Sequence, residues 1–254
     1  MKKLAFFAMT AIATASYALT PVGPGSIVIT GTSTQLANVN SGSVVKNTSH
    51  AGSFASQNLA SNQGLIDISG TSSQTAVVTH GIVTNEAMNG GDVAVQSLAS
   101  NVGKVTIAKN STQEAYVSNS TMTNKASGDG CDNCSDGTAA AYQNGATNFG
   151  KVKITGTSNQ KLDVSGWSTV SNTANGGNAV AVQNLSSNYG DVTISGTSNQ
   201  TTYVSGGSMV ANLASGTHSS AYQNLASNDY CMPPPPLCVG AACGPFSLAR
   251  LSWN

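Results

Sequence analysis

Amide side chains recur along this chain at spacings that suit hydrogen-bonded ladders. One glutamine series has a period near forty residues and consists of Gln35, Gln74, Gln113, Gln160 and Gln200. A second series consists of Gln57, Gln96, Gln143, Gln183 and Gln223. An asparagine follows each member of the second series, at Asn62, Asn101, Asn148, Asn188 and Asn228. Because an amide both donates and accepts, identical amides stacked on one another can each bond to the next.

Apolar residues keep the same register as these amides. An isoleucine opens each copy, at Ile29, Ile68, Ile107, Ile154 and Ile194. A valine follows at Val39, Val78, Val117, Val164 and Val204. A further asparagine occupies the second half of each copy, at Asn47, Asn85, Asn124, Asn172 and Asn212. Such self-similarity indicates a stacked array, in which the isoleucines and valines form a core between neighbouring copies.

The repeats divide the chain into a central array and flanking segments. The five copies span 26–64, 65–103, 104–150, 151–190 and 191–230, and the third contains an insertion. The flanking segments are a signal peptide at 1–18, a leader at 19–25 and a Pro/Cys-rich tail at 231–254. The prolines of the tail cannot join a strand ladder, so the array must end there. The tail could cap the last copy, or dock on another subunit or a surface partner.

Residues 1–18 have the features of a secretory signal. Lys2 and Lys3 precede an apolar stretch, Leu4–Ala15, and a small-x-small cleavage site follows at Ser16–Ala18. This stretch is too short for a permanent membrane span, and the alternative interpretation is a buried amphipathic helix. We therefore expect a secreted protein, extracellular or on a cell surface, with no membrane span after removal of the signal.

Within each copy the local pattern is that of short strands. Val152–Ile154 and Val192–Ile194 alternate apolar and polar residues, and Ala179–Gln183 is a further strand candidate. Four such strands per copy make two strand–turn–strand arches of about twenty residues each, and no helical period is sustained. The predicted fold is all-β, a β-solenoid of about ten stacked arches spaced about 4.8 Å apart.

The charge content fits stacking and excludes several partners. Charged residues make up 8% of the chain, with ten basic and ten acidic side chains, against about 25% in ordinary domains. This balance gives no field to attract nucleic acid or an anionic membrane. Two like charges one strand spacing apart would repel by roughly 3 kcal/mol at an effective dielectric constant near 20. No copy has a charged residue at the repeat positions of the amides. This favours ladders over the alternative, in which the amides mark solvated turns.

Five cysteines lie outside the repeat pattern. Cys131 and Cys134 are in the insertion, and Cys231, Cys238 and Cys243 are in the tail. A C-x-x-C pair can be a redox motif, half of a metal site or a loop-closing disulfide. No thioredoxin-like context, zinc-ligand spacing or EF-hand spacing accompanies it. A disulfide between Cys131 and Cys134 is therefore favoured, and we expect no metal and no cofactor.

The sequence offers no support for catalysis. There is no grouping of Ser, His and Asp in a nucleophile context and no phosphate-binding loop, and the three histidines are scattered over separate copies. We therefore predict that the protein is not an enzyme.

Residues 176–183 resemble a family signature. Gly176-Gly177-Asn178-Ala-Val-Ala-Val-Gln183 is similar to the Gly-x-Gly-Asn-x-Ala-x-x-x-Gln motif of curlin subunits, and the resemblance extends over 26–230. Curlins are secreted proteins that polymerise into functional amyloid fibres on bacterial surfaces. The resemblance implies a β-solenoid with Gln/Asn ladders and a fibre for adhesion or biofilm matrix. It also implies that the chain's main partner is itself, with an outer-membrane export or nucleator protein as another.

Two other functions are compatible with the repeats. A monomeric, capped β-solenoid adhesin would bind a surface ligand without polymerising. An ice-binding solenoid is suggested by Thr30-Gly-Thr32 and Thr155-Gly-Thr157, although that series is interrupted at Ala108–Asn110. The leading prediction is a structural subunit that self-assembles by β-augmentation into an extracellular amyloid-like fibre.

Overall fold

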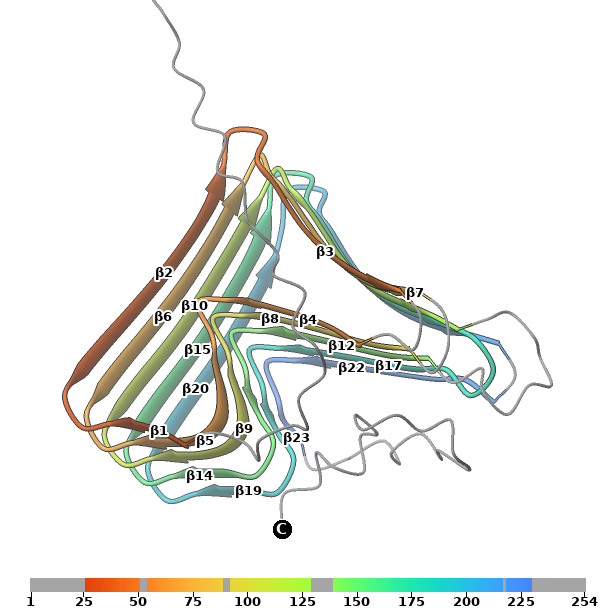
Figure 1. Ribbon diagram of the computed structural model, residues 1–254. Helices are drawn as coiled ribbons and strands as arrows, with labels where there is room; N and C mark the ends of the chain where they lie inside the picture. Colours follow the sequence, from red (N-terminus) through yellow and green to blue (C-terminus); the bar gives the residue numbers. More distant parts are fainter. Residues whose placement is uncertain (1–25, 51–53, 89–91, 129–138, 217, 230–254) are drawn as a thin grey trace, which may run out of the picture.

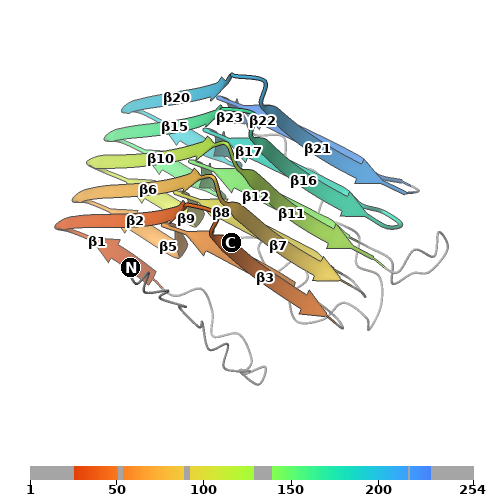
Figure 2. The same ribbon diagram turned by 90° about the horizontal axis from the view of Figure 1, so that it is seen from above.

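In the computed structural model the chain is a parallel β-solenoid of five coils (Figure 1). The structure describes residues 26–50, 54–88, 92–128, 139–216 and 218–229. The coils coincide with the repeats, and Figure 2 shows them stacked in sequence order. The prediction of an all-β solenoid is confirmed.

Each coil contributes strands to four parallel sheets, which we name after their first strands. The β1 sheet contains β1 (Ser26–Ile29), β5 (Asn62–Ile68), β9 (Asn101–Ile107), β13 (Asn148–Phe149), β14 (Val152–Ile154), β18 (Asn188–Tyr189), β19 (Val192–Ile194) and β23 (Asn228–Asp229). The β2 sheet contains β2 (Thr32–Asn40), β6 (Thr71–Thr79), β10 (Asn110–Ser118), β15 (Thr157–Ser165) and β20 (Thr197–Val204). The β3 sheet contains β3 (Val44–His50), β7 (Ile82–Met88), β11 (Thr121–Ser127), β16 (Thr169–Asn175) and β21 (Met209–Ser215). The β4 sheet contains β4 (Phe54–Leu59), β8 (Val93–Leu98), β12 (Ala140–Gly145), β17 (Val180–Leu185) and β22 (Ser220–Leu225).

The register corrects the expected number of stacked layers. Ile68 pairs with Ile29 on one side and with Ile107 on the other, so partners are one whole repeat apart. The two arches of a repeat therefore lie in the same layer, and the array has five layers where the sequence had suggested about ten. The four strands of a coil follow a bent path, with the β2 sheet along one side and the β3 and β4 sheets face to face along another (Figure 1).

The core is divided into separate apolar clusters. Ile29, Ile68, Ile107 and Ile154 are buried behind the β1 sheet, and Val39, Val78, Val117 and Val164 are buried between the β2 and β3 sheets. Alanines such as Ala87, Ala126 and Ala141 fill the narrow space between the β3 and β4 sheets. Small side chains let these two sheets approach closely, so the backbone of one sheet comes within reach of amides on the other.

Two predicted core residues differ from their counterparts. Val204 is 42% exposed and Ile194 is only half-buried. Both belong to the fifth coil, and among the described residues no further coil is stacked on them. The prediction that Val204 is buried within this chain is therefore wrong, whereas its counterpart at the other end, Val39, is buried at 6% exposure.

Glycines at the coil ends allow close stacking of the backbone. Gly103 has a φ of +133°, and a Cβ placed there would lie 2.0 Å from the carbonyl oxygen of Gly64. Gly150 has a φ of +116°, and its Cβ would lie 2.1 Å from the carbonyl oxygen of Gly103. Only glycine combines this conformation with such an approach.

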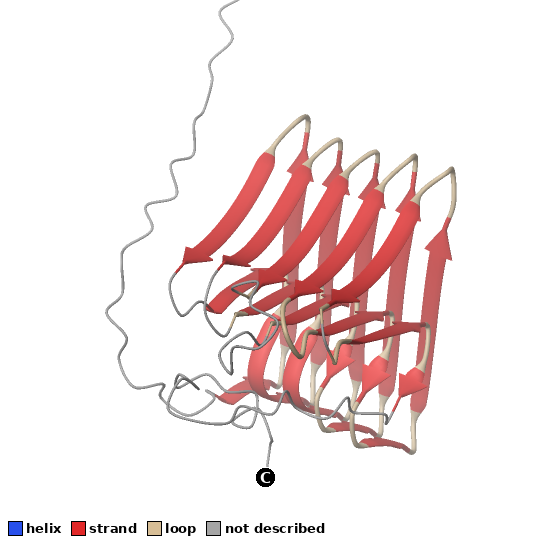
Figure 3. Ribbon diagram, turned by 90° about the vertical axis from the view of Figure 1, so that its right-hand side faces the viewer, coloured by secondary structure: helices blue, strands red, loops and turns tan. Residues whose placement is uncertain are grey.

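The described residues form strands, turns and bends, as Figure 3 shows. In this part of the chain no helix has the length and hydropathy needed to cross a membrane.

Candidate assembly surfaces at the two ends of the solenoid

Asn47, Asn85, Asn124, Asn172 and Asn212 form a continuous ladder between the β3 and β4 sheets. Nδ2 of Asn124 donates to Oδ1 of Asn172 at 2.8 Å. The same nitrogen donates to the backbone carbonyls of Ala94 and Tyr142 on the β4 sheet, at 3.1 and 2.9 Å. Asn85, Asn124 and Asn172 are all 0% exposed. This ladder therefore joins neighbouring coils and fastens the two sheets together.

A second ladder runs through Asn62, Asn101, Asn148, Asn188 and Asn228. In each step Nδ2 donates to Oδ1 of the following coil, over 2.8 to 3.0 Å. Side chains of the first glutamine series point at this ladder. Nε2 of Gln74 donates to Oδ1 of Asn101 at 2.7 Å, and Gln35, Gln160 and Gln200 make the same contact in their own coils.

The first glutamine series thus donates hydrogen bonds to the asparagine ladder. It does not form a continuous ladder of its own, contrary to the sequence prediction. Within the described residues, the one bond between two of these glutamines joins Nε2 of Gln113 to Oε1 of Gln74 at 3.1 Å. In the other coils the glutamine nitrogen donates to an asparagine oxygen of the same coil instead of to the next glutamine. The spacing of the glutamines along the chain does not reveal this alternative acceptor.

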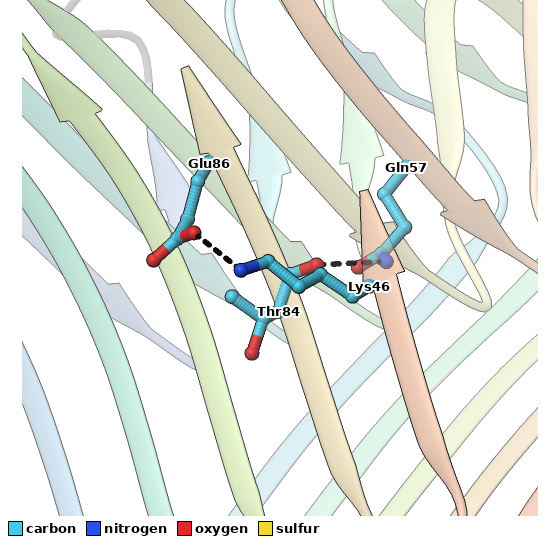
Figure 4. Close-up of polar contacts among 4 residues, drawn as sticks. All are labelled: Lys46, Gln57, Thr84 and Glu86. Carbon is cyan, nitrogen blue, oxygen red and sulfur yellow. Dashed lines mark hydrogen bonds and ion pairs between the residues drawn. The ribbon is translucent and has the colours of Figure 1, made fainter. Parts of the chain in front are cut away.

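The second glutamine series is a continuous ladder of opposite direction. Nε2 of Gln96 donates back to Oε1 of Gln57 at 2.9 Å, and Gln143, Gln183 and Gln223 continue the pattern. Nε2 of Gln96 also donates to the carbonyl of Thr123 on the following coil, at 3.2 Å. Gln57 makes the equivalent bond to the carbonyl of Thr84, at 3.1 Å (Figure 4).

These opposed ladders give the two ends complementary hydrogen-bonding groups. At the fifth coil, Nδ2 of Asn212 donates to the carbonyls of Ala181 and Tyr222, and the described residues provide no following coil with another Oδ1. Oε1 of Gln223 likewise has no following Nε2 among them. At the first coil the situation is reversed, because Oδ1 of Asn47 and Nε2 of Gln57 have no preceding coil in the described chain.

Strand edges that have no partner among the described strands accompany these groups, together with exposed apolar side chains. β2, β3 and β4 are the terminal strands of their sheets at one end, and β20, β21 and β22 are terminal at the other. Val204 and Leu225 are 42% and 45% exposed at the fifth coil, although both occupy positions that are buried in the interior coils. Such an edge is a template for pairing with another chain.

Several charged side chains lie on the outward faces, and among the described residues two oppositely charged pairs join neighbouring coils. Nζ of Lys46 is 3.3 Å from Oε2 of Glu86 (Figure 4), and Nζ of Lys151 is 3.3 Å from Oδ2 of Asp191. Lys161 lies over the ring of Tyr116, 5.0 Å from its centroid. Exposed pairs of this kind contribute at most about 1 kcal/mol each. The ladders themselves carry no charge.

The predicted disulfide between Cys131 and Cys134, the signal peptide and the tail lie outside the described residues. Within the described ranges, His, Cys, Asp and Glu side chains do not gather into a group that could hold a metal ion. Comparison with protein-family models, curated proteins and solved structures found no match to this chain.

Proposed function

We propose that this chain is a structural subunit that stacks end to end into an extracellular fibre, used for adhesion or biofilm matrix at a bacterial surface. The observation that carries the proposal is the complementarity of the two ends. The fifth coil presents the donor of Asn212 and the acceptor of Gln223. The first coil presents the acceptor of Asn47 and the donor of Gln57.

A second copy placed on the fifth coil would continue every column of the array. Asn212 of one copy would donate to Asn47 of the next, and Gln57 of the next copy would donate back to Gln223. Val204 would lie next to Val39, in the relation that Val117 and Val164 have within the chain. Such a contact joins two different surfaces, so it repeats without closing and produces a filament.

The groups at the two ends are sufficient to hold one copy on the next. Strand pairing satisfies the unpaired backbone groups, the ladders satisfy the terminal amides, and burial of Val204 and Leu225 adds a hydrophobic contribution. No charged residue occupies the ladder columns, so stacking brings no like charges together there.

The test is concentration-dependent growth of the purified chain, followed by light scattering and electron microscopy. We expect a lag that short preformed filaments abolish, because a filament end offers a ready template. A protein that remains monomeric at all concentrations, as expected of a capped adhesin, would contradict the proposal.

A further inference from the structure

The outward side of the β4 sheet meets the β1 sheet in an apolar corner. We call this surface the outer corner and define it by Val95, Tyr142 and Val182 on the β4 sheet and by Val102, Phe149 and Tyr189 on the β1 sheet. The rings of Tyr142 and Phe149 meet edge to face with centroids 6.1 Å apart. Phe149 and Tyr189 are stacked with centroids 5.0 Å apart and planes inclined by 3°. The corner is therefore a continuous aromatic surface running along the solenoid axis.

Five side chains of the outer corner are buried and the sixth, Phe149, is half-buried, although those on the β4 sheet point away from the facing β3 sheet. Tyr142 is 6% exposed and Val182 is 0% exposed. The equivalent outward positions of the β3 sheet, such as Thr123 and Lys125, are half-buried in the same coil. Among the described strands, β12 packs against its sheet neighbours, against β11 and β16 on its inner side, and against β13 at the corner, where Tyr142 meets Phe149. No described strand lies across the rest of its outer side (Figure 1). An additional layer must cover this corner.

The two extreme coils indicate how far that layer extends along the solenoid. In the fifth coil, inward-pointing Gln223 and Leu225 are exposed whereas outward-pointing Tyr222 and Asn224 are half-buried. In the first coil the outward-pointing Phe54 and Ser56 are likewise half-buried, and only Asn58 is exposed on that side of β4. The outer side is therefore covered as far as the fifth coil and partly covered at the first coil.

We propose that the outer corner is the docking site of this chain's own segment 231–254, which runs from the fifth coil back toward the first. The segment follows β23, whose neighbour in the sheet, β18, contains Tyr189 of the corner. Fully extended, a segment of this length spans roughly 80 Å, whereas the five coils rise only about 20 Å. It therefore reaches every coil without strain.

The chemistry of the segment matches the corner. Pro233–Pro236 favours the polyproline II conformation, and proline-rich segments dock in aromatic-lined grooves with little loss of chain entropy. Leu237, Phe246 and Trp253 supply further apolar side chains. Burial raises the pKa of the Tyr142 hydroxyl well above its usual value, which is consistent with an apolar cover. A tail bound along the side of the solenoid leaves the fifth coil open.

The chain's own cysteines provide a direct test. We would replace Val182 by cysteine at the corner, with Ser171→Cys on the outward face of the β3 sheet as the control in the same coil. After reduction, dilution and reoxidation, Val182→Cys should form an intramolecular disulfide with Cys231, Cys238 or Cys243, identified by peptide mass. Ser171→Cys should form severalfold less. Equal yields for the two variants, or disulfides only between chains, would overturn the proposal; the second outcome would assign the corner to another copy.

A second measurement covers the case in which Val182→Cys fails to fold. Nitration of Tyr142 is compared between the full chain and a full-length variant in which Pro233–Pro236 are replaced by serine, with Tyr116 of the β2 sheet as the internal standard. We expect severalfold faster nitration of Tyr142 in the variant and no change at Tyr116. Unchanged protection of Tyr142 would overturn the proposal. Both assays use dilute monomer, so their outcome is independent of filament formation.

Discussion

Asn124 and Asn172 are 48 residues apart in the sequence, yet Nδ2 of the first lies 2.8 Å from Oδ1 of the second in the interior of the solenoid. The same nitrogen reaches the carbonyls of Ala94 and Tyr142. One amide thus connects the third coil to the fourth and the β3 sheet to the β4 sheet. Its contribution depends on donation, because all three bonds use its hydrogens.

Replacing Asn124 by aspartate should strongly destabilise the fold. The substitution removes the donated bonds and places a carboxylate opposite carbonyl oxygens in a buried site, so we expect a loss of about 3–5 kcal/mol in the free energy of unfolding. Asn159→Asp is the matched control, since the half-buried Asn159 accepts a bond from Asn199 and aspartate retains that function. Urea unfolding measures both. Equal losses would show that the ladder has no special role.

Replacing Gly150 by alanine should strain the junction between the third and fourth coils. The backbone there has a positive φ, and the added Cβ would collide with the carbonyl of Gly103. We expect a cost of about 1–3 kcal/mol. Gly31→Ala is the control, because no atom lies within 4 Å of a Cβ at that position. Thermal unfolding should show a lowered Tm for Gly150→Ala and little change for Gly31→Ala.

Stability should fall in alkaline solution because of Tyr142. Burial raises the pKa of its hydroxyl above the ordinary tyrosine value of 10.0, so in the pH range between the two values the unfolded chain releases a proton that the folded chain retains. This contribution to stability is complete below pH 10 and is lost as the pH rises above it, by about 1.4 kcal/mol per unit for one group. Tyr142→Phe should show a smaller fall between pH 9 and pH 11. An identical pH dependence would count against burial of this hydroxyl.

A charge on the ladder at the end of the solenoid should stop growth while leaving the monomer folded. Gln223 is exposed in the fifth coil, so lysine is tolerated there, but stacking another coil would bury the ammonium group without a partner. We expect Gln223→Lys to lengthen the lag or abolish filaments. Asn199→Lys is on an outward, exposed position of the same coil and should assemble normally. Comparable growth of the two variants would show that the amide ladders are not needed for assembly.

The sequence was informative where one residue type recurs at one position. The buried amides of the second glutamine series and the isoleucines behind the β1 sheet could be identified because stacking demands identical neighbours. The number of layers could not, since two similar half-repeats are equally compatible with pairing to each other and with pairing one full repeat away. The register shows the second arrangement, in which Gln96 is bonded to Gln57 and Gln143.

The sequence pattern also did not indicate which of two neighbouring acceptors a glutamine would bond to. Nothing in the spacing of Gln74 indicates that Asn101 lies nearer than the next glutamine in the series.

The outer corner, in contrast, has a recognisable sequence pattern. Val180–Val182 is a continuous apolar run, which is typical of a strand buried on both faces, whereas strict alternation would have indicated one exposed face.

Filament growth requires that the fifth coil of one copy pairs with the first coil of the next. The test is to mix Asn47→Lys, which blocks the first coil, with Asn212→Lys, which blocks the fifth, after circular dichroism has shown both to be folded. Each variant alone should be monomeric in sedimentation, because every head-to-tail junction would bury one lysine. The mixture should form a one-to-one dimer and stop there, since only one pair of unmodified ends remains. A mixture that stays monomeric, or a single variant that dimerises with itself, would contradict head-to-tail stacking.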